Sequence, residues 1–291
     1  MCYLCDNEYF QKNNNMLLLP NCKINIGLNV VSKREDGYHN LETVFYPIPL
    51  RDNLEIKVLD EKEDLPYRLT VGGKPVEGNA ADNLVVKVYL SLKDEFKLPA
   101  LDIFLFKNIP MGAGLGGGSS DAASMICGLN ELFDLGLTPD EMERRVAKFG
   151  ADCAFFVRNR PAYATGIGDV LTSIPLLLKG KYIVLVKPDV FVSTKEAYAH
   201  VTPKPAQTPL AEAIKCPIDT WKDTVVNDFE LSVFPNHPEL AAIKQTLYDM
   251  GALYAAMSGS GSTLFGIFNR PIEEASKVFE KHFVFTQKLA L

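Results

Sequence analysis

A glycine-rich connection between an apolar strand and a helix constrains this chain more than any other feature of its sequence. Residues 109–123 read Ile-Pro-Met-Gly-Ala-Gly-Leu-Gly-Gly-Gly-Ser-Ser-Asp-Ala-Ala, so glycines and two serines stand directly before an alanine-rich helix start. Glycine lets backbone N–H groups approach a phosphate where a Cβ would collide, and the start of a helix favours negative charge. The segment therefore predicts a site for a nucleotide or another phosphorylated ligand.

Two common phosphate-binding motifs fit this segment poorly. Its glycines match G-x-G-x-x-G at Gly112, Gly114 and Gly117, after a strand predicted at residues 101–107. However, the helix predicted near 119–132 is followed by a second helix, where a dinucleotide-binding unit needs a parallel strand. Gly118 stands where a Walker A motif has lysine, and the chain contains no H-R-D or D-F-G kinase motif. A flexible linker also fits poorly, because an apolar strand and a good helix flank the loop.

Composition excludes several other classes of protein. The chain has 291 residues, 47% of them hydrophobic and 23% charged, which suits about two folded domains. A net charge of −6 makes nucleic acid a poor ligand. No apolar run approaches the roughly 18 residues of a membrane span, so we expect no membrane partner and a cytoplasmic location. Structural zinc is not expected, because only Cys2 and Cys5 are closely spaced and the four histidines lie far apart.

The pattern of apolar residues predicts two α/β domains after a polar extension. We expect residues 1–15 to be disordered or frayed, an N-terminal domain over 16–176 and a C-terminal domain over 177–291. In the first, alternation over residues 17–31 predicts a half-buried strand with Lys23 and Asn25 on one face. Thr138 caps a predicted helix, and Asp152 falls in a loop before a strand predicted at 154–157. In the second, strands are predicted at 181–186, 253–257, 264–268 and 283–288.

Several separated motifs resemble the GHMP kinases. They are Lys23-Ile-Asn25 on the first strand, the glycine segment from Pro110 to Ser120, and Ser258-Gly-Ser-Gly-Ser-Thr263, and their order and spacing match over nearly all of the chain after Met16. Three further motifs are similar to one branch of that superfamily: Arg34-x-Asp-Gly-Tyr-His-x-Leu41, Gly150-Ala-Asp-Cys-Ala-Phe-Phe156 and Asn227-Asp228. That branch phosphorylates the 2-hydroxyl of 4-diphosphocytidyl-2-C-methyl-D-erythritol with ATP, in the non-mevalonate isoprenoid pathway.

The resemblance implies an α+β fold of two domains, with the substrates between them. The N-terminal, ATP-binding part is expected to be of the ribosomal-protein-S5-like type and the C-terminal part to be ferredoxin-like. It also implies that the cofactor is ATP with Mg²⁺, and that the partners are small molecules, namely ATP and a cytidine diphosphate-linked polyol. The sequence does not indicate an oligomeric state.

Site residues follow from the same resemblance. Asp152 is the expected catalytic base, and Lys23 is expected beside it, because a neighbouring positive charge favours an ionised carboxylate. Taken alone, Asp152 could cap a turn and Lys23 could be a solvated strand residue. The expected ATP-binding residues are Pro110, Met111, Gly112, Ala113, Gly114, Leu115, Gly116, Gly117, Gly118, Ser119 and Ser120. The Mg²⁺ ligands are not identified, although Ser119 or Ser120 could reach the metal of Mg-ATP.

The remaining expected contacts concern the acceptor and the adenine. The expected substrate-binding residues are Asn25, Tyr38, His39, Tyr198, Gly259, Ser260 and Gly261. Tyr198 falls where the family has an aromatic ring that stacks on cytosine, although a core aromatic on a helix face fits it nearly as well. Asn25 is expected to orient His39 or the substrate, and segment 258–263 could also be a simple loop. Adenine contacts are expected around Asn83 and Lys107.

Two alternatives stay open at this level. Another GHMP-type kinase, acting on homoserine, mevalonate or a sugar, would keep the glycine loop and change the surroundings of Tyr38, His39 and Tyr198. A nucleotide-binding regulatory protein would have lost catalysis, which the presence of Lys23 and Asp152 argues against.

Overall fold

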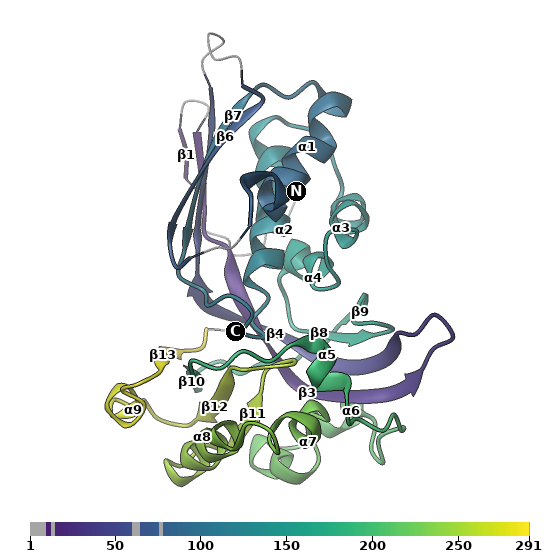
Figure 1. Cartoon of the computed structure of the whole chain (residues 1–291), viewed down its shortest axis with the longest axis vertical. Helices are drawn as coiled ribbons and strands as arrows, with labels where there is room; N and C mark the ends of the chain where they lie inside the picture. Colours follow the sequence, from purple (N-terminus) through teal and green to yellow (C-terminus); the bar gives the residue numbers. More distant parts are fainter. Residues whose placement is uncertain (1–9, 13–14, 60–64, 76–77, 291) are drawn as a thin grey trace. The chain divides into compact units, whose positions relative to one another are not determined.

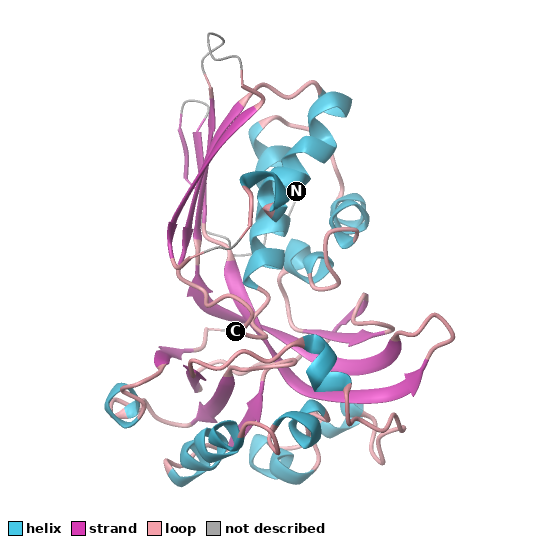
Figure 2. Cartoon of the chain, in the orientation of Figure 1, coloured by secondary structure: helices cyan, strands magenta, loops and turns pink. Residues whose placement is uncertain are grey.

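The computed structural model describes residues 10–12, 15–59, 65–75 and 78–290, and the chain divides into two compact units. The first unit consists of Met1–Cys22, Leu50–Met111 and Gly116–Arg160, and the second of Lys23–Pro49, Gly112–Leu115 and Pro161–Leu291. The units are interleaved along the chain, whereas the domains predicted from the sequence follow one another with a boundary after residue 176. That sequential division stays a prediction. Both units mix helices and strands (Figure 2), in agreement with the predicted α+β class.

The first unit is built on a five-stranded sheet. Its strands, in spatial order, are β1 (Phe10–Lys12), β2 (Asn15–Leu18), β5 (Asn53–Val58), β7 (Leu101–Lys107) and β6 (Tyr67–Gly73). Only β6 and β7 pair in parallel, and the other neighbours are antiparallel. The predicted frayed extension thus includes a short strand, β1, while its residues 1–9 and 13–14 lie outside the described part of the chain.

Helices α1 and α2 cover one face of this sheet (Figure 1). The helices of the unit are η1 (Ala80–Asp82), α1 (Leu84–Phe96), α2 (Gly117–Leu132), α3 (Pro139–Ala147) and α4 (Cys153–Arg158). Asn83 caps α1 by accepting a hydrogen bond from the Val85 N–H. Thr138 and Glu141 form a capping box at the start of α3, as the sequence indicated.

One element of the first unit differs in type from its prediction. The run at residues 154–157 was expected to be a strand, but it lies in α4, with Cys153, Phe155 and Phe156 buried. A short, wholly apolar run carries no periodicity that separates a buried strand from a buried helical turn. This expectation was wrong, and Asp152 therefore stands at the start of a helix.

The second unit contains a sheet in the order β3, β4, β8 and β9. These strands are β3 (Asn21–Lys33), β4 (His39–Arg51), β8 (Ala162–Thr165) and β9 (Val170–Ser173), and the first two extend into the first unit at residues 21–22 and 50–51. The strand predicted over 17–31 is divided by Pro20 into β2 and β3, and β3 is buried on both faces from Asn21 to Val30. Strands β8 and β9 were not predicted.

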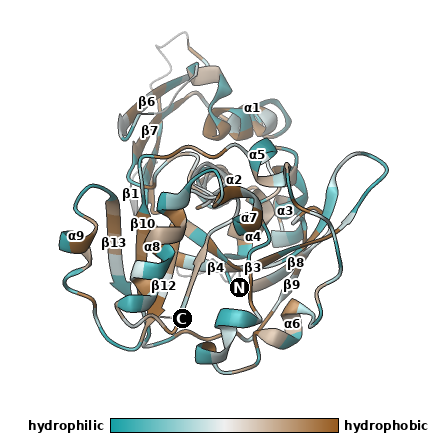
Figure 3. Cartoon of the chain, turned by 60° about the horizontal axis from the view of Figure 1, so that its bottom comes forward, coloured by the Kyte–Doolittle hydropathy of each residue, from teal (hydrophilic) through white to brown (hydrophobic). Residues whose placement is uncertain are grey.

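A second, antiparallel sheet in this unit supports its main core. Its strands, in order, are β11 (Tyr254–Met257), β12 (Leu264–Phe268), β10 (Tyr182–Lys187) and β13 (Phe283–Lys288). The helices are α5 (Thr194–Tyr198), α6 (Leu210–Ala213), η2 (Ile218–Asp223), α7 (Phe229–Val233), α8 (Pro238–Asp249) and α9 (Ala275–Val278). Val184, Leu247 and Phe268 bury their side chains in the core between this sheet and helices α7 and α8, and β10 and β12 are mostly hydrophobic (Figure 3).

Within the described residues, no helix combines the length and the hydropathy that crossing a membrane requires.

Candidate active site

The backbone of the glycine segment has the conformation of an anion-binding loop. Gly112, Gly114 and Gly116 have φ values of 57°, 74° and 70°, alternating with residues of ordinary φ. Such alternation turns successive N–H groups toward one side. Between Gly112 and Leu115, no backbone N–H donates a hydrogen bond to another described residue, whereas the carbonyls of Ala113, Gly114 and Leu115 all accept one. These N–H groups are therefore not engaged by the described part of the chain.

The carbonyl groups of residues 113–115 are held by two other parts of the second unit. From β3, the Lys23 N–H donates to Leu115 O at 2.9 Å and Lys23 Nζ donates to Gly114 O at 3.1 Å. From the segment between β11 and β12, Ser258 Oγ donates to Gly114 O at 2.8 Å and the Thr263 N–H to Ala113 O at 3.3 Å. Segment 258–263 is thus a support for residues 112–115 rather than a simple loop.

Two glycines of the segment differ in what surrounds them. At Gly114, with its positive φ, a Cβ would lie 2.0 Å from the carbonyl oxygen of Ser258, so only glycine allows this packing. At Gly118, in the first turn of α2, the nearest atom to a Cβ is Leu84 Cδ1 at 3.9 Å. The sequence explained every glycine by ligand approach, but Gly114 is needed first by the fold.

Lys23 is a buried residue with defined partners. It is 3% exposed, its Nζ donates to Asn25 Oδ1 at 2.6 Å, and it lies 5.0 Å from the centre of the Phe45 ring. Asn25 Nδ2 in turn donates to Thr43 Oγ1 at 2.9 Å. The expected placement of Lys23 and Asn25 on one face is confirmed, and the solvated alternative for Lys23 is excluded. The amide of Asn25 orients Lys23, so a further role toward His39 or the substrate stays a prediction.

Asp152 lies in the first unit, directly before α4. It occupies the N-terminal cap position, but its backbone is already helical and its side chain makes no capping hydrogen bond. The Asp152 side chain therefore does not cap helix α4. Because Lys23 belongs to the second unit, its pairing with Asp152 stays a prediction.

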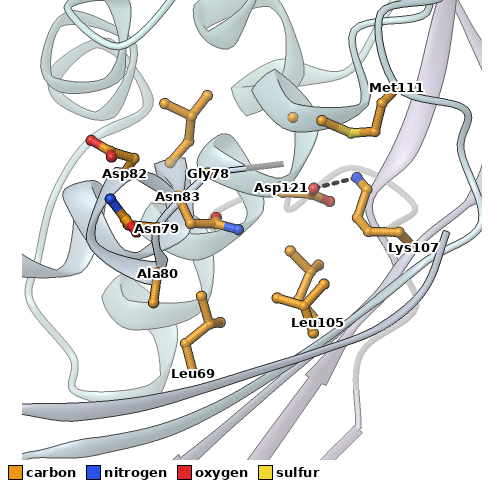
Figure 4. A pocket seen from close by; sticks show the side chains of 13 residues that line it. Leu69, Gly78, Asn79, Ala80, Asp82, Asn83, Leu105, Lys107, Met111 and Asp121 are labelled. Carbon is orange, nitrogen blue, oxygen red and sulfur yellow. Dashed lines mark hydrogen bonds and ion pairs between the residues drawn. The ribbon is translucent and has the colours of Figure 1, made fainter. Parts of the chain in front are cut away.

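A cavity of about 380 Å³ opens in the first unit between the sheet and helix α2. Its walls are mainly aliphatic, from Leu69, Leu84 and Leu105, and its polar groups include Asn83, Lys107 and Asp121 (Figure 4). Met111 and Gly118 of the predicted ATP loop also line it. An apolar slot with a few polar groups suits a planar base, and it contains both residues expected to contact adenine, Asn83 and Lys107.

Lys107 and Asp121, which line this cavity, belong to a buried charge cluster. Lys107 Nζ donates to Asp121 Oδ2 at 2.5 Å and to Asp52, and all three side chains are almost completely buried. Asp52 Oδ1 also accepts the Asn108 and Ile109 N–H groups, at 2.6 and 2.8 Å. The sequence missed Asp52 and Asp121, although Lys107 on an inward-facing position of β7 was a signal for a buried partner.

Two carboxylates share one ammonium group in this cluster. Burial, and then the charge of Asp52, raise the pKa of Asp121 to about 7 against the opposing effect of Lys107. Burial lowers the pKa of Lys107, but the two carboxylates outweigh it, so its pKa is raised. Burial and the neighbouring carboxylate thus shift the pKa of Asp121 toward neutrality.

The predicted acceptor residues of the second unit include one preformed aromatic pair. The rings of His39 and Tyr198 are stacked with centroids 4.8 Å apart, and Phe229 packs against Tyr198 edge-on at 4.7 Å. Tyr38, at the tip between β3 and β4, is 62% exposed. Since His39 and Tyr198 are already in stacking contact, a base does not fit between them. Stacking on cytosine requires an outer ring face or a movement of Tyr198.

The chain is similar to known proteins over most of its length. Residues 83–160 match the family described as GHMP kinases N terminal domain, and residues 218–284 match GHMP kinases C terminal. A relative from Bacteroides fragilis, named 4-diphosphocytidyl-2-C-methyl-D-erythritol kinase, is 52% identical over 275 residues, which cover 94% of this chain and 100% of the relative. A relative of the same name from Bacteroides thetaiotaomicron is 54% identical, covering 87% of this chain and 92% of its own length.

A solved structure is similar to this chain in its fold. It is described as the crystal structure of 4-(cytidine 5'-diphospho)-2C-methyl-D-erythritol kinase, and its TM-score to this chain is 0.78 at 29% identity. The match covers 93% of this chain and 98% of the other. The two-domain GHMP kinase fold predicted from the sequence is confirmed.

The two glycines that differ in surroundings are expected to respond differently to alanine. Gly114→Ala should lower the melting temperature and weaken binding of ATP, the ligand predicted from the sequence, because the new Cβ meets Ser258. Gly118→Ala should leave the melting temperature equal or higher, because alanine favours the helix, and should weaken ATP binding by about tenfold by blocking the ligand. Calorimetric titration and thermal unfolding measure both, and unchanged ATP affinity in Gly118→Ala would contradict close approach at that position.

Stability should depend on pH through Asp121. Its pKa is higher in the folded protein than the value of 3.8 for an unperturbed aspartate, so the folded state binds the extra proton. The stabilisation is present at low pH and is lost as the pH rises from about 4 to about 7. Between pH 5 and 8 the free energy of unfolding of the parent should therefore fall relative to Asp121→Asn. Parallel curves for the two proteins in denaturant titrations would show that Asp121 does not carry this proton.

Proposed function

The chain belongs to the family of the 4-diphosphocytidyl-2-C-methyl-D-erythritol kinases within the GHMP kinases, and we propose that it transfers the γ-phosphoryl group of ATP to the 2-hydroxyl of 4-diphosphocytidyl-2-C-methyl-D-erythritol. The observation that carries the proposal is 52% identity over the full length of a relative with that name. The reaction is a step of non-mevalonate isoprenoid synthesis, and we expect it to occur in the cytoplasm. The expected partners are small molecules rather than nucleic acid or membranes.

ATP is proposed to bind with its base in the first unit and its phosphates on the glycine segment. The aliphatic cavity beside Asn83 and Lys107 suits adenine. The N–H groups of residues 112–115, which have no acceptor among the described residues, suit phosphate oxygens. The start of α2 adds the positive end of a helix dipole. These features support the assignment of Pro110 to Ser120 as ATP-binding residues.

Mg²⁺ is proposed to arrive with ATP. Among the described residues, no group of three or more histidine, cysteine, aspartate or glutamate side chains could hold a metal. Magnesium commonly keeps several waters and binds through substrate phosphates with few protein ligands. Ser119 in the first turn of α2, half-buried, is the hydroxyl that fits this role better than Ser120, which is 2% exposed. When bound, Mg²⁺ neutralises charge on the β- and γ-phosphates.

Asp152 and Lys23 are proposed to act on the acceptor hydroxyl. Asp152 takes the proton as the hydroxyl oxygen forms a bond to the γ-phosphorus and the bond from that phosphorus to the β–γ bridging oxygen breaks, releasing ADP. Lys23 polarises the hydroxyl and favours the ionised carboxylate. The burial of Lys23 among Asn25, Phe45 and Gly114 supports its role, and the Gly150-Ala-Asp152 motif supports that of Asp152.

Recognition of the acceptor is proposed to depend on its cytidine end. Tyr198 offers a ring that Phe229 and His39 hold in place, and Tyr38 is exposed beside His39. Gly259, Ser260 and Gly261 are proposed to contact the reacting end of the acceptor. Stacking tolerates any base, so hydrogen bonds around His39 must select cytosine. A kinase for homoserine or mevalonate would have no use for such an aromatic site.

The catalytic base can be tested by a substitution that keeps its shape. Asp152→Asn should lower kcat by about 10²- to 10⁴-fold, because an amide cannot accept the proton, while ATP affinity stays nearly intact. Asp140→Asn, a change of the same type on exposed α3, is the matched control and should leave kcat unchanged. A folded Asp152→Asn enzyme with the parent kcat would remove Asp152 from this role.

The acceptor assignment can be tested by a competition among alcohols. The protein should phosphorylate the cytidyl substrate far more efficiently than homoserine, mevalonate or galactose, and equal efficiency for any of these would refute the proposed function. Tyr198→Ala should raise the acceptor KM by about 5- to 150-fold with little effect on ATP, since one stacking partner contributes about 1–3 kcal/mol. Tyr182→Ala, which packs against the same core, is the control for lost packing.

A further inference from the structure

The open edge of strand β11 is covered by side chains instead of another strand. Because β11 ends its sheet, its outward N–H and C=O groups have no strand partner. Tyr248 Oη donates to Ala255 O at 3.2 Å, and Asn227 Nδ2 donates to Met257 O and Gly259 O, both at 2.8 Å. Glu230 Oε1 accepts the Met257 N–H at 2.8 Å. Both backbone polar groups of Met257 are therefore bound by residues at the start of α7.

Glu230 has a second partner, Lys244, whose positive charge offsets part of the cost of burying the carboxylate. Its other oxygen, Oε2, accepts from Lys244 Nζ of α8 at 2.6 Å, and its side chain is only 10% exposed. Burying a carboxylate is costly, and desolvation raises the pKa of Glu230 despite the Lys244 charge. An uncharged acceptor such as glutamine could bind the Met257 N–H at lower cost. The carboxylate instead links two elements, α8 through one oxygen and the end of β11 through the other.

Ser258, the residue after Met257, connects Met257 to the glycine segment. Ser258 is fully buried, its Oγ donates to Gly114 O, and its own carbonyl packs against the Cα of Gly114 so closely that a Cβ would be 2.0 Å away. The Asn25 N–H also donates to Ser258 Oγ, at 3.1 Å. A shift of Met257 therefore moves the contact that holds Gly114.

We infer that Glu230 is a positioning residue for nucleotide binding: through the Met257 N–H it sets the position of Ser258, which holds Gly114 and the N–H groups of residues 112–115 in the geometry that receives the triphosphate. The inference rests on the proposed function only in taking ATP as the ligand. No contact between Glu230 and the nucleotide is required.

The test separates positioning from stability with three variants. Glu230→Leu removes the acceptor for Met257, Glu230→Gln keeps an acceptor and loses the charge, and Lys244→Met removes the charge partner and keeps the acceptor. The ATP dissociation constant is measured by calorimetry without acceptor, beside the melting temperature. Glu230→Leu should weaken ATP binding about 5- to 150-fold, the range for a lost hydrogen bond that leaves a buried donor unpaired. Glu230→Gln should stay within threefold, and Lys244→Met should lower the melting temperature without changing ATP affinity.

Should Glu230→Leu not fold, the double variant Glu230→Leu with Lys244→Leu replaces the pair by apolar residues and leaves no unpaired charge. It should fold and show the same loss of ATP affinity. Parent-like affinity in either leucine variant overturns the inference, as does an equal loss in Glu230→Gln or Lys244→Met. A parent that binds ATP but does not phosphorylate the cytidyl acceptor refutes the proposed function alone, whereas a parent that binds no ATP refutes both.

Discussion

Two hydrogen bonds converge on the carbonyl oxygen of Gly114, and the candidate site of the second unit depends on them. One comes from the ammonium group of Lys23 and the other from the hydroxyl of Ser258, so strand β3 and segment 258–263 meet at a single acceptor. With the carbonyl turned into the protein, the neighbouring N–H groups remain available. Folding of the unit thus produces the donor array before any ligand binds, which is the preorganisation that phosphoryl transfer requires.

Three buried charged residues position parts of the candidate site. Lys23, Lys107 and Glu230 are each at least nine-tenths buried, and each is bound by neighbouring polar groups. A buried ion pair such as Lys107–Asp121 or Glu230–Lys244 often contributes no more stability than a pair of well-packed apolar residues. Their common property is position: Lys23 touches the glycine segment, Lys107 lines the cavity of the first unit, and Glu230 holds the strand that leads to Ser258.

Local signals in the sequence were sufficient for most elements and for the chemistry of the glycine segment. The capping box of Thr138 and Glu141, the alternation along β7 and the shared face of Lys23 and Asn25 are decided by neighbours in the chain. The run at 154–157 was misjudged because buried helix and buried strand have the same apolar composition over so few residues. Asp52, Asp121 and Glu230 were missed because their partners lie on other elements of the fold.

The sequence by itself determined which family of folds this chain adopts and which segment is the candidate phosphate site, because periodicity, caps and a run of glycines act over short distances. Only the tertiary structure shows which contacts make individual residues necessary for the fold. Gly114 is required by the carbonyl of Ser258, 144 positions away in the chain. Lys107 is paired with Asp52, between β4 and β5, and with Asp121 of α2, which lie 55 and 14 positions away. Contacts of this kind depend on how distant segments pack, and no local pattern records them.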